Sequence, residues 1–150
     1  MNLIKRLFPW WLKLSLKIFL NRIPFKKYIF LKLGIFKHGD MDKSDYILYV
    51  FEGHLFRSEL SYGQLSNLNI LELGPGNSVG TALIASSCSA KSFLVDNGNY
   101  ANKSKEIYSD LKNKLLNKGL LPPEVENVED LNSLLNICNS NYLTNGILSL

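Results

Sequence analysis

The sequence predicts an α/β fold built on a parallel β-sheet, and three observations in the middle of the chain indicate this. Residues 69–73 and 92–95 are short apolar runs, as expected of strands buried in a parallel sheet. About eighteen residues separate the two runs, which suits a crossover through one helix. Glycines cluster directly after the first run, at positions 74, 76 and 80. These features predict one β-α-β unit with a glycine-rich first turn.

The N-terminal region is apolar, aromatic and basic. Residues 1–39 contain nine Lys or Arg and no Asp or Glu. Residues 40–150 contain eight Lys or Arg and thirteen Asp or Glu, a net charge of −5. Basic residues interrupt the apolar stretch, which argues against a membrane-spanning helix, and no signal-peptide cleavage site follows it. Pro9 and Pro24 fit the starts of two helices, and Gly34 fits the end of the second.

Three interpretations of this N-terminal extension stay open. In the first, it is a helical extension that packs on the domain that follows. In the second, residues 1–33 lie on a membrane surface, with tryptophans at headgroup depth and lysines on anionic lipid. Binding of nucleic acid is the least favoured of the three.

A polar turn at residues 37–42 leads into a predicted helix for which Ser44 or Asp42 is the candidate capping residue. This helix lies directly before the first strand. We interpret His38 as a turn residue and His54 as a helix-surface residue rather than as catalytic groups, because the sequence assigns no acidic partner to either.

The ligand of the glycine turn is decided by charge. Glu72 lies two residues before Gly74, at the mouth of the turn. A carboxylate there repels a pyrophosphate and attracts a ligand with an ammonium or sulfonium group. The glycine spacing is G-x-G-x-x-x-G and differs from the G-x-G-x-x-G of dinucleotide-binding turns. S-adenosylmethionine carries both cationic groups and no phosphate, so it fits this turn better than a dinucleotide does.

Two motifs resemble the first two cofactor motifs of class I, Rossmann-like S-adenosylmethionine-dependent methyltransferases. They are Glu72-Leu73-Gly74-Pro75-Gly76 and the acid Asp96 that ends the second apolar run. The resemblance implies that the backbone of Gly74–Gly76 packs under the methionine moiety and that Glu72 lies near its amino group. It also implies that Asp96 binds the ribose hydroxyls.

Two asparagines complete the expected site. Asn97 follows Asp96 and offers donors to the ribose. The resemblance places an adenine contact after the third strand, where Asn145 is a candidate, although an ordinary Asn-Gly turn explains this residue equally well. The expected cofactor-binding residues are therefore Glu72, Gly74, Pro75, Gly76, Asp96, Asn97 and Asn145.

The remainder of the chain predicts two helices, at residues 101–118 and 130–138, and a third strand at 142–144. The lysines of the first of these helices are expected to face solvent. Cys88 and Cys138 form no C-x-x-C pattern, so we expect reduced thiols in the cytoplasm. With two histidines and two separated cysteines, the chain offers almost no ligands for a metal site.

The family resemblance also implies how much of a domain is present. Class I methyltransferases have a seven-stranded sheet ordered 3-2-1-4-5-7-6. We therefore expect an incomplete Rossmann-like methyltransferase sheet, strands 1 to 3, preceded by an α-helical N-terminal extension. Residues 1–66 would form the basic-aromatic extension and a cofactor-covering helix, and residues 67–150 the N-terminal half of the domain. Strand 1 would then be an open apolar edge, and a complementing C-terminal half would be a partner.

These observations predict a methyltransferase that uses S-adenosylmethionine and lies in the cytoplasm, either free or peripheral to the membrane. The catalytic half is expected to lie beyond these residues, so that the fragment alone is inactive. The motifs identify no catalytic residue, and they leave the acceptor open as a small molecule or a glycan-type molecule. Two other classes stay open. One is a non-catalytic remnant or membrane-surface interaction protein, and the other is an NAD(P)-dependent oxidoreductase on a similar β-α-β unit.

Overall fold

A computed structural model of the chain describes residues 11, 15, 40–101, 104–126 and 128–144. The chain divides into two compact units, Met1–Lys37 and His38–Leu150. In the first unit only Trp11 and Ser15 are described, and both are helical and exposed. The predictions for the rest of the N-terminal extension, for His38 and for Asn145 lie outside the described residues.

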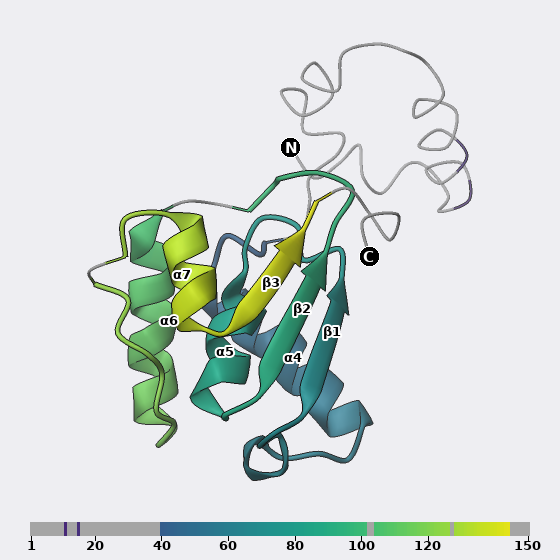
Figure 1. The fold of residues 1–150 in the computed structure, drawn as a ribbon. Helices are drawn as coiled ribbons and strands as arrows, with labels where there is room; N and C mark the ends of the chain where they lie inside the picture. Colours follow the sequence, from purple (N-terminus) through teal and green to yellow (C-terminus); the bar gives the residue numbers. More distant parts are fainter. Residues whose placement is uncertain (1–10, 12–14, 16–39, 102–103, 127, 145–150) are drawn as a thin grey trace, which may run out of the picture. The chain divides into compact units, whose positions relative to one another are not determined.

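The second unit contains a three-stranded parallel sheet in the order β1-β2-β3 (Figure 1). The strands are β1 (Asn69–Leu73), β2 (Lys91–Val95) and β3 (Ser140–Leu143). In this register Glu72 of β1 lies beside Leu94 of β2, and Leu94 lies beside Tyr142 of β3. The predicted α/β fold with a parallel sheet is confirmed, and the arrangement is Rossmann-like.

The third strand begins two residues before the predicted start at 142. Ser92 Oγ donates a hydrogen bond of 2.7 Å to Ser140 Oγ, and Ser140 Oγ donates one of 3.0 Å to the Cys138 carbonyl. These bonds satisfy two buried hydroxyls and allow a polar residue to start a buried strand. An apolar pattern does not reveal such a start.

Four α-helices pack on one face of the sheet, as Figure 1 shows. They are α4 (Ser44–Arg57), α5 (Gly80–Ser87), α6 (Lys105–Asn117) and α7 (Leu131–Ile137), and a short 3-10 helix, η1 (Tyr62–Gln64), precedes β1. Strand residues on the helical face are buried, among them Ser92 and Leu94. On the opposite face Leu71 and Leu73 are 62% and 66% exposed. Among the described elements, none covers this second face.

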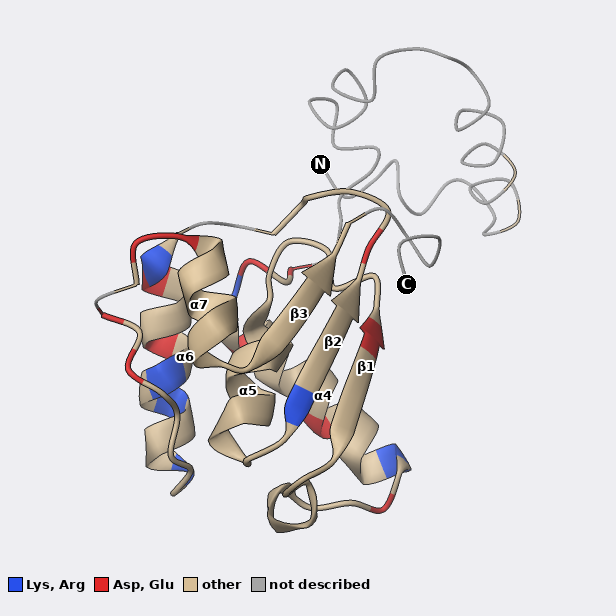
Figure 2. Cartoon of the chain, in the orientation of Figure 1, with Lys and Arg blue, Asp and Glu red and all other residues tan. Residues whose placement is uncertain are grey.

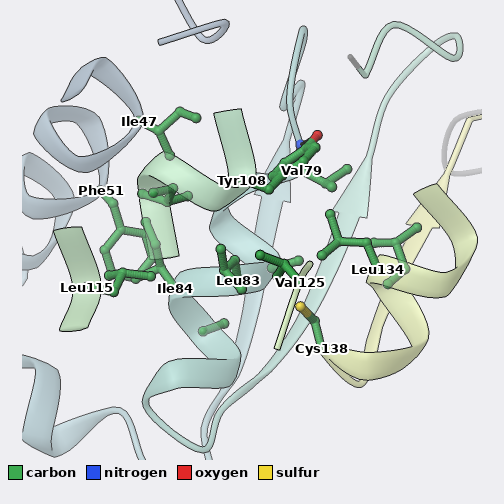
Figure 3. Close-up of a cluster of buried hydrophobic side chains, with 14 of the residues drawn as sticks. Ile47, Phe51, Val79, Leu83, Ile84, Tyr108, Leu115, Val125, Leu134 and Cys138 are labelled. Atoms are coloured by element: carbon green, nitrogen blue, oxygen red, sulfur yellow. Dashed lines mark hydrogen bonds between the residues drawn. The ribbon is translucent and has the colours of Figure 1, made fainter. Parts of the chain in front are cut away.

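The hydrophobic core lies between the helices and the sheet (Figure 3). Ile47 and Phe51 come from α4, Leu83 and Ile84 from α5, and Leu115 from α6. All five side chains are buried, and they meet in one layer. This layer packs α4 and α5 together on the helical side of the sheet.

Gly80 has a packing role at the start of α5. A Cβ atom built there would lie 2.7 Å from Ile47 Cγ2 and 3.1 Å from Leu111 Cδ2. Both of those side chains are fully buried, so neither can move aside easily. The close approach of three helices therefore explains the third glycine of the motif.

Lys112 corrects the expectation that the lysines of α6 face solvent. Its side chain is only 8% exposed, and Nζ donates to Glu124 Oε2 at 2.6 Å and to Glu126 Oε1 at 2.8 Å. Both glutamates lie on the link that follows α6, so this cluster ties the link to the helix. Helical periodicity does not reveal a partner that lies outside the helix.

Candidate functional site

The turn after β1 uses a backbone conformation that favours glycine. Gly74 and Gly76 have φ angles of +73° and +69°. Gly74 N donates to the Val95 carbonyl at 2.8 Å, which fixes the turn against the end of β2. A Cβ at Gly74 would meet no atom within 4 Å, and one at Gly76 would meet only the Gly74 carbonyl, at 3.9 Å. Conformation rather than crowding therefore requires these glycines, and space beside the turn stays open to a ligand.

Asp96 joins the two expected cofactor motifs directly. Its Oδ2 accepts a hydrogen bond of 3.0 Å from Gly76 N, and its Oδ1 accepts one of 2.7 Å from Asn97 N. The Asp96 backbone N donates to the Leu143 carbonyl at 2.8 Å, which places the residue at the carboxyl end of the sheet. Asp96 therefore holds the glycine turn in addition to any contact with a ligand.

Tyr142 fixes the loop that follows Asp96, a role that sequence reasoning missed. Its hydroxyl donates to the Gly98 carbonyl at 3.0 Å and accepts from Tyr100 N at 3.3 Å. These bonds hold the loop that carries Asn97, whose side chain is exposed. A tyrosine at the end of a predicted strand is the sequence feature that could have indicated this role. Its hydroxyl needs a hydrogen-bond partner when the ring is half-buried.

Glu72 is the least satisfied polar group of the site. Its side chain lies on the helical face of β1, and its Oε2 is buried with no hydrogen-bond partner among the residues that the structure describes. Burial raises the pKa of this carboxyl above 4.5, a side-chain hydrogen bond with Thr81 opposes the rise, and the charge of Asp96 adds to it. Thr81 also escaped the sequence analysis, because it is an unremarkable polar residue in the first turn of α5.

A groove of about 550 Å³ runs between α4, β1 and the glycine turn. Glu72 lines it together with Gly74 and Pro75, so this residue lies at the groove beside the turn, and its Oε2 is buried. The exposed His54 of α4 lies on the opposite wall, and Asp96 is not part of the lining. The other lining residues are Met41, Tyr46, Val50, Phe51, Ile70, Leu71, Leu73 and Thr81. Most of the lining residues are thus apolar, and Glu72 is the one acidic residue among them.

Few charged residues lie on the sheet itself (Figure 2). Glu72 and Lys91 are the only charged residues within β1, β2 and β3, and they lie at opposite ends of their strands. Asp96 follows β2 at the same end as Glu72. The carboxyl end of the sheet therefore carries negative charge, and no described Lys or Arg lines the groove.

Three further features of the described part of the chain concern metal ligands, thiols and membrane-spanning helices. In the ranges 40–101, 104–126 and 128–144, no group of three or more His, Cys, Asp or Glu is placed to hold a metal ion. Cys88 and Cys138 are free and buried, and burial raises the pKa of the Cys138 thiol to about 12. No described helix is long and apolar enough to cross a membrane.

Comparisons of the chain with known protein families, with curated proteins and with solved structures found no match in any of the three. The Rossmann-like parallel sheet and the geometry of the glycine turn are therefore the basis for any functional assignment.

Proposed function

We propose that the second unit binds S-adenosylmethionine and is the cofactor-binding part of a methyltransferase. The observation that carries the proposal is Glu72, whose Oε2 is buried beside the glycine turn with no hydrogen-bond partner among the described residues. An unpaired buried carboxylate oxygen is costly. An ammonium or sulfonium group in the groove would supply the missing partner and favour the charged carboxylate.

The same charges disfavour a dinucleotide. A pyrophosphate at this turn would meet the carboxylates of Glu72 and Asp96, and no described basic side chain lines the groove to compensate. An NAD(P)-dependent oxidoreductase is accordingly the weaker candidate.

Each expected residue within the described ranges has a role in the proposed complex. The backbone of Gly74–Gly76 passes under the methionine moiety, and Glu72 pairs with the amino group. Asp96 accepts hydrogen bonds from the ribose through lone pairs that its two backbone donors leave unused, and Asn97 lies beside it. The bound cofactor supplies an activated methyl group, and the protein contributes proximity and orientation toward a small-molecule or glycan acceptor.

Calorimetric titration of the 150-residue chain with S-adenosylmethionine tests this proposal. We expect the wild type to bind and Glu72→Gln to bind about tenfold more weakly, because one charge-assisted contact is lost. Gly74→Val should also weaken binding, since valine is strained at a φ of +73°. Glu59→Gln alters an exposed carboxylate outside the groove and serves as the matched control.

Two results would contradict the proposal. One is the absence of binding to a folded wild-type chain, and the other is equal binding by wild type and Glu72→Gln. Binding of NADH that improves in Glu72→Ala would instead favour the oxidoreductase.

A second candidate function is binding to a membrane surface through residues 1–33. The specific observation is that Trp11 lies in a helix and is 55% exposed, within a segment that carries nine basic and no acidic residues up to position 39. Exposed tryptophan with neighbouring lysines is typical of helices that lie in the interface of anionic membranes.

A further inference from the structure

Tyr142 belongs to a row of three side chains that crosses the sheet at its carboxyl end. The register places Glu72 of β1 beside Leu94 of β2, and Leu94 beside Tyr142 of β3. Residues that lie opposite each other on neighbouring strands point to the same face, and Leu94 is buried on the helical face. Asp96 follows β2 at this same end of the sheet. The row therefore carries a polar side chain on each side of Leu94, close to both expected cofactor motifs.

The Tyr142 hydroxyl closes the loop that follows β2. It donates a hydrogen bond of 3.0 Å to the Gly98 carbonyl and accepts one of 3.3 Å from Tyr100 N. One side-chain oxygen thus pairs with two backbone groups of residues 96–100, which we call the Asp96 loop. These five residues form neither helix nor strand, so the bonds to Tyr142 supply order that regular structure does not.

The Asp96 loop is also packed closely on itself. A Cβ atom built at Gly98 would lie 2.8 Å from Tyr100 Cζ and 2.9 Å from Tyr100 Oη, so the half-buried Tyr100 ring lies directly against the Gly98 backbone. At the start of the loop, Asp96 Oδ2 accepts a hydrogen bond from Gly76 N. The loop is therefore held at its beginning by the glycine turn and at its end by Tyr142.

The protonation state of Tyr142 suits this role. Burial raises the pKa of its hydroxyl above the ordinary range of a tyrosine, and the charge of Asp96 adds to the rise. The hydroxyl therefore keeps its proton at neutral pH and can donate to the Gly98 carbonyl. The influence of Asp96 also indicates that this carboxylate and the hydroxyl lie near each other.

We infer that Tyr142 is a positioning residue for the ribose of the proposed cofactor. The inference rests on the proposed function, in which Asp96 binds the ribose hydroxyls and Asn97 lies beside it. Tyr142 acts through the Asp96 loop and needs no contact with the ligand. A residue that binds a ligand has to be held within about 0.5 Å of its working geometry, and supporting hydrogen bonds achieve this.

The inference divides the cofactor between the two polar residues of the row. Glu72 serves the ammonium and sulfonium groups at the groove, and Tyr142 serves the ribose through the Asp96 loop. Tyr142 does not line the groove, so loss of its hydroxyl should leave the Glu72 side unchanged. A general loosening of the fold would weaken both halves of the cofactor together, so the two explanations predict different results.

Hydrogen exchange of the ligand-free full chain, measured by NMR, tests whether the hydroxyl holds the loop. Tyr142→Phe retains the ring and removes the bond to Tyr100 N, so we expect the Tyr100 amide to exchange about fivefold faster. Tyr62→Phe is the matched control. Tyr62 is another half-buried tyrosine, whose hydroxyl donates to Glu52 Oε1 at 2.9 Å outside the Asp96 loop. Its loss should leave the Tyr100 amide unchanged.

NMR titration with two partial ligands tests the positioning role itself. Adenosine carries the ribose without the charged groups, and S-methylmethionine carries the ammonium and sulfonium groups without the ribose. We expect Tyr142→Phe to bind adenosine about threefold to tenfold more weakly than wild type and to bind S-methylmethionine equally well. Glu72→Gln should show the reverse pattern, and Tyr62→Phe should bind both ligands as wild type does.

Two kinds of failure are distinguishable. Equal adenosine binding by wild type and Tyr142→Phe would overturn the inference alone. An equal loss for both ligands in this variant would do the same, as would an unchanged exchange rate of the Tyr100 amide. A folded wild-type chain that binds neither S-adenosylmethionine nor adenosine would instead overturn the proposed function, and the inference with it.

Discussion

Two carboxylates flank the glycine turn, and they differ in burial and in hydrogen bonding. Asp96 accepts hydrogen bonds from Gly76 N and Asn97 N, whereas Glu72 keeps one buried oxygen without a partner among the described residues. Two backbone donors pair with the first carboxylate, whereas burial destabilises the charged form of the second. Asp96 should therefore stabilise the free protein, while Glu72 should gain its stabilisation from a cationic ligand.

The first residue-scale prediction concerns Asp96. Asp96→Ala removes the acceptor of two backbone N–H groups, so we expect the free energy of unfolding to fall by about 1–3 kcal/mol. Asp96→Asn retains one acceptor oxygen and should lose about half as much. Urea unfolding measures both changes, with Asp42→Ala at an exposed position as the control. If Asp96→Ala unfolds at the same urea concentration as wild type, the proposed role in holding the turn is wrong.

The second prediction concerns the pH dependence that Glu72 causes. Burial is the main reason that its folded-state pKa is raised above 4.5. Above pH 4.5 the folded protein therefore binds more protons at this site than the unfolded chain does. Ionisation of Glu72 thus lowers the free energy of unfolding as the pH rises through the raised pKa. Glu72→Gln should remove this loss and raise the stability at pH 7 by about 1 kcal/mol.

Urea unfolding between pH 4.5 and pH 7 measures how the stabilities of wild type and Glu72→Gln differ. The range starts at pH 4.5 because this is the ordinary pKa of a glutamate carboxyl. The profile of Glu72→Gln should be flatter than that of wild type, and Glu59→Gln, at an exposed carboxylate, should follow wild type. Parallel profiles for wild type and Glu72→Gln would show that Glu72 has an ordinary pKa in the folded protein.

The sequence predicts the glycine turn better than it predicts the hydrogen bonds around that turn. The positive φ angles at Gly74 and Gly76 follow from a tight turn after a strand, a feature that spacing reveals. The bond between Asp96 and Gly76 joins residues twenty positions apart, and it depends on how β1 and β2 align. The hydrogen bonds of Thr81 and Tyr142 were not predicted for a similar reason, because side-chain hydroxyl groups follow no periodic pattern along the sequence.

At the scale of secondary-structure elements, Gly80 gives a sharp test of helix packing. Alanine normally stabilises a helix relative to glycine by about 1 kcal/mol. At Gly80, however, a Cβ would lie 2.7 Å from Ile47 Cγ2 and 3.1 Å from Leu111 Cδ2, and both side chains are buried. Overpacking of this kind costs about 1–3 kcal/mol, so we expect Gly80→Ala to destabilise the protein by about 1 kcal/mol net.

Gly53 provides a matched control within α4. A Cβ at this position would meet only Arg57 Nη1, at an ordinary 3.5 Å, so Gly53→Ala should stabilise the protein by up to about 1 kcal/mol. Thermal unfolding of the two variants should therefore shift in opposite directions. Ile47→Val removes the Cδ1 methyl group, which would lie 2.9 Å from the added Cβ. Adding this change should therefore reduce the destabilisation caused by Gly80→Ala. Equal shifts for both glycines would show that α4 and α5 pack less closely than the structure indicates.

Element types were more predictable than element ends. The β-α-β unit was confirmed because apolar runs, a glycine turn and helical spacing agree with one another along residues 69–95. The start of β3 was wrong because the Ser92 and Ser140 hydroxyls bond to each other inside the sheet. The expectation for α6 failed at Lys112, because its partners lie on a link that has no regular pattern.

At the scale of the whole molecule, charge is divided along the sequence. Residues 1–39 carry nine basic and no acidic residues, and residues 40–150 have a net charge of −5. A uniform charge of one sign over a short apolar segment favours adsorption to a surface of opposite charge. The chain as a whole has a pI near 9.0, so this basic segment dominates its net charge at neutral pH.

Binding to vesicles tests the role of this segment. We expect the full chain to co-sediment with vesicles of mixed anionic and zwitterionic lipid, and to bind several-fold less to purely zwitterionic vesicles. Binding should fall as salt rises from 0.1 M to 1 M, because the Debye length shrinks from about 10 Å to about 3 Å. Replacement of Trp10 and Trp11 by alanine should weaken binding at every salt concentration, because burial of apolar surface is not screened.

The control is a variant in which Tyr49, an exposed aromatic residue of α4, becomes alanine. It removes a similar exposed ring from the second unit, so it should leave vesicle binding unchanged if the first unit alone meets the lipid. Equal binding to both vesicle types would exclude electrostatic attraction as the cause. A loss in the Tyr49 variant as large as that in the tryptophan variant would instead place the contact on the second unit, and the basic segment would then need another role.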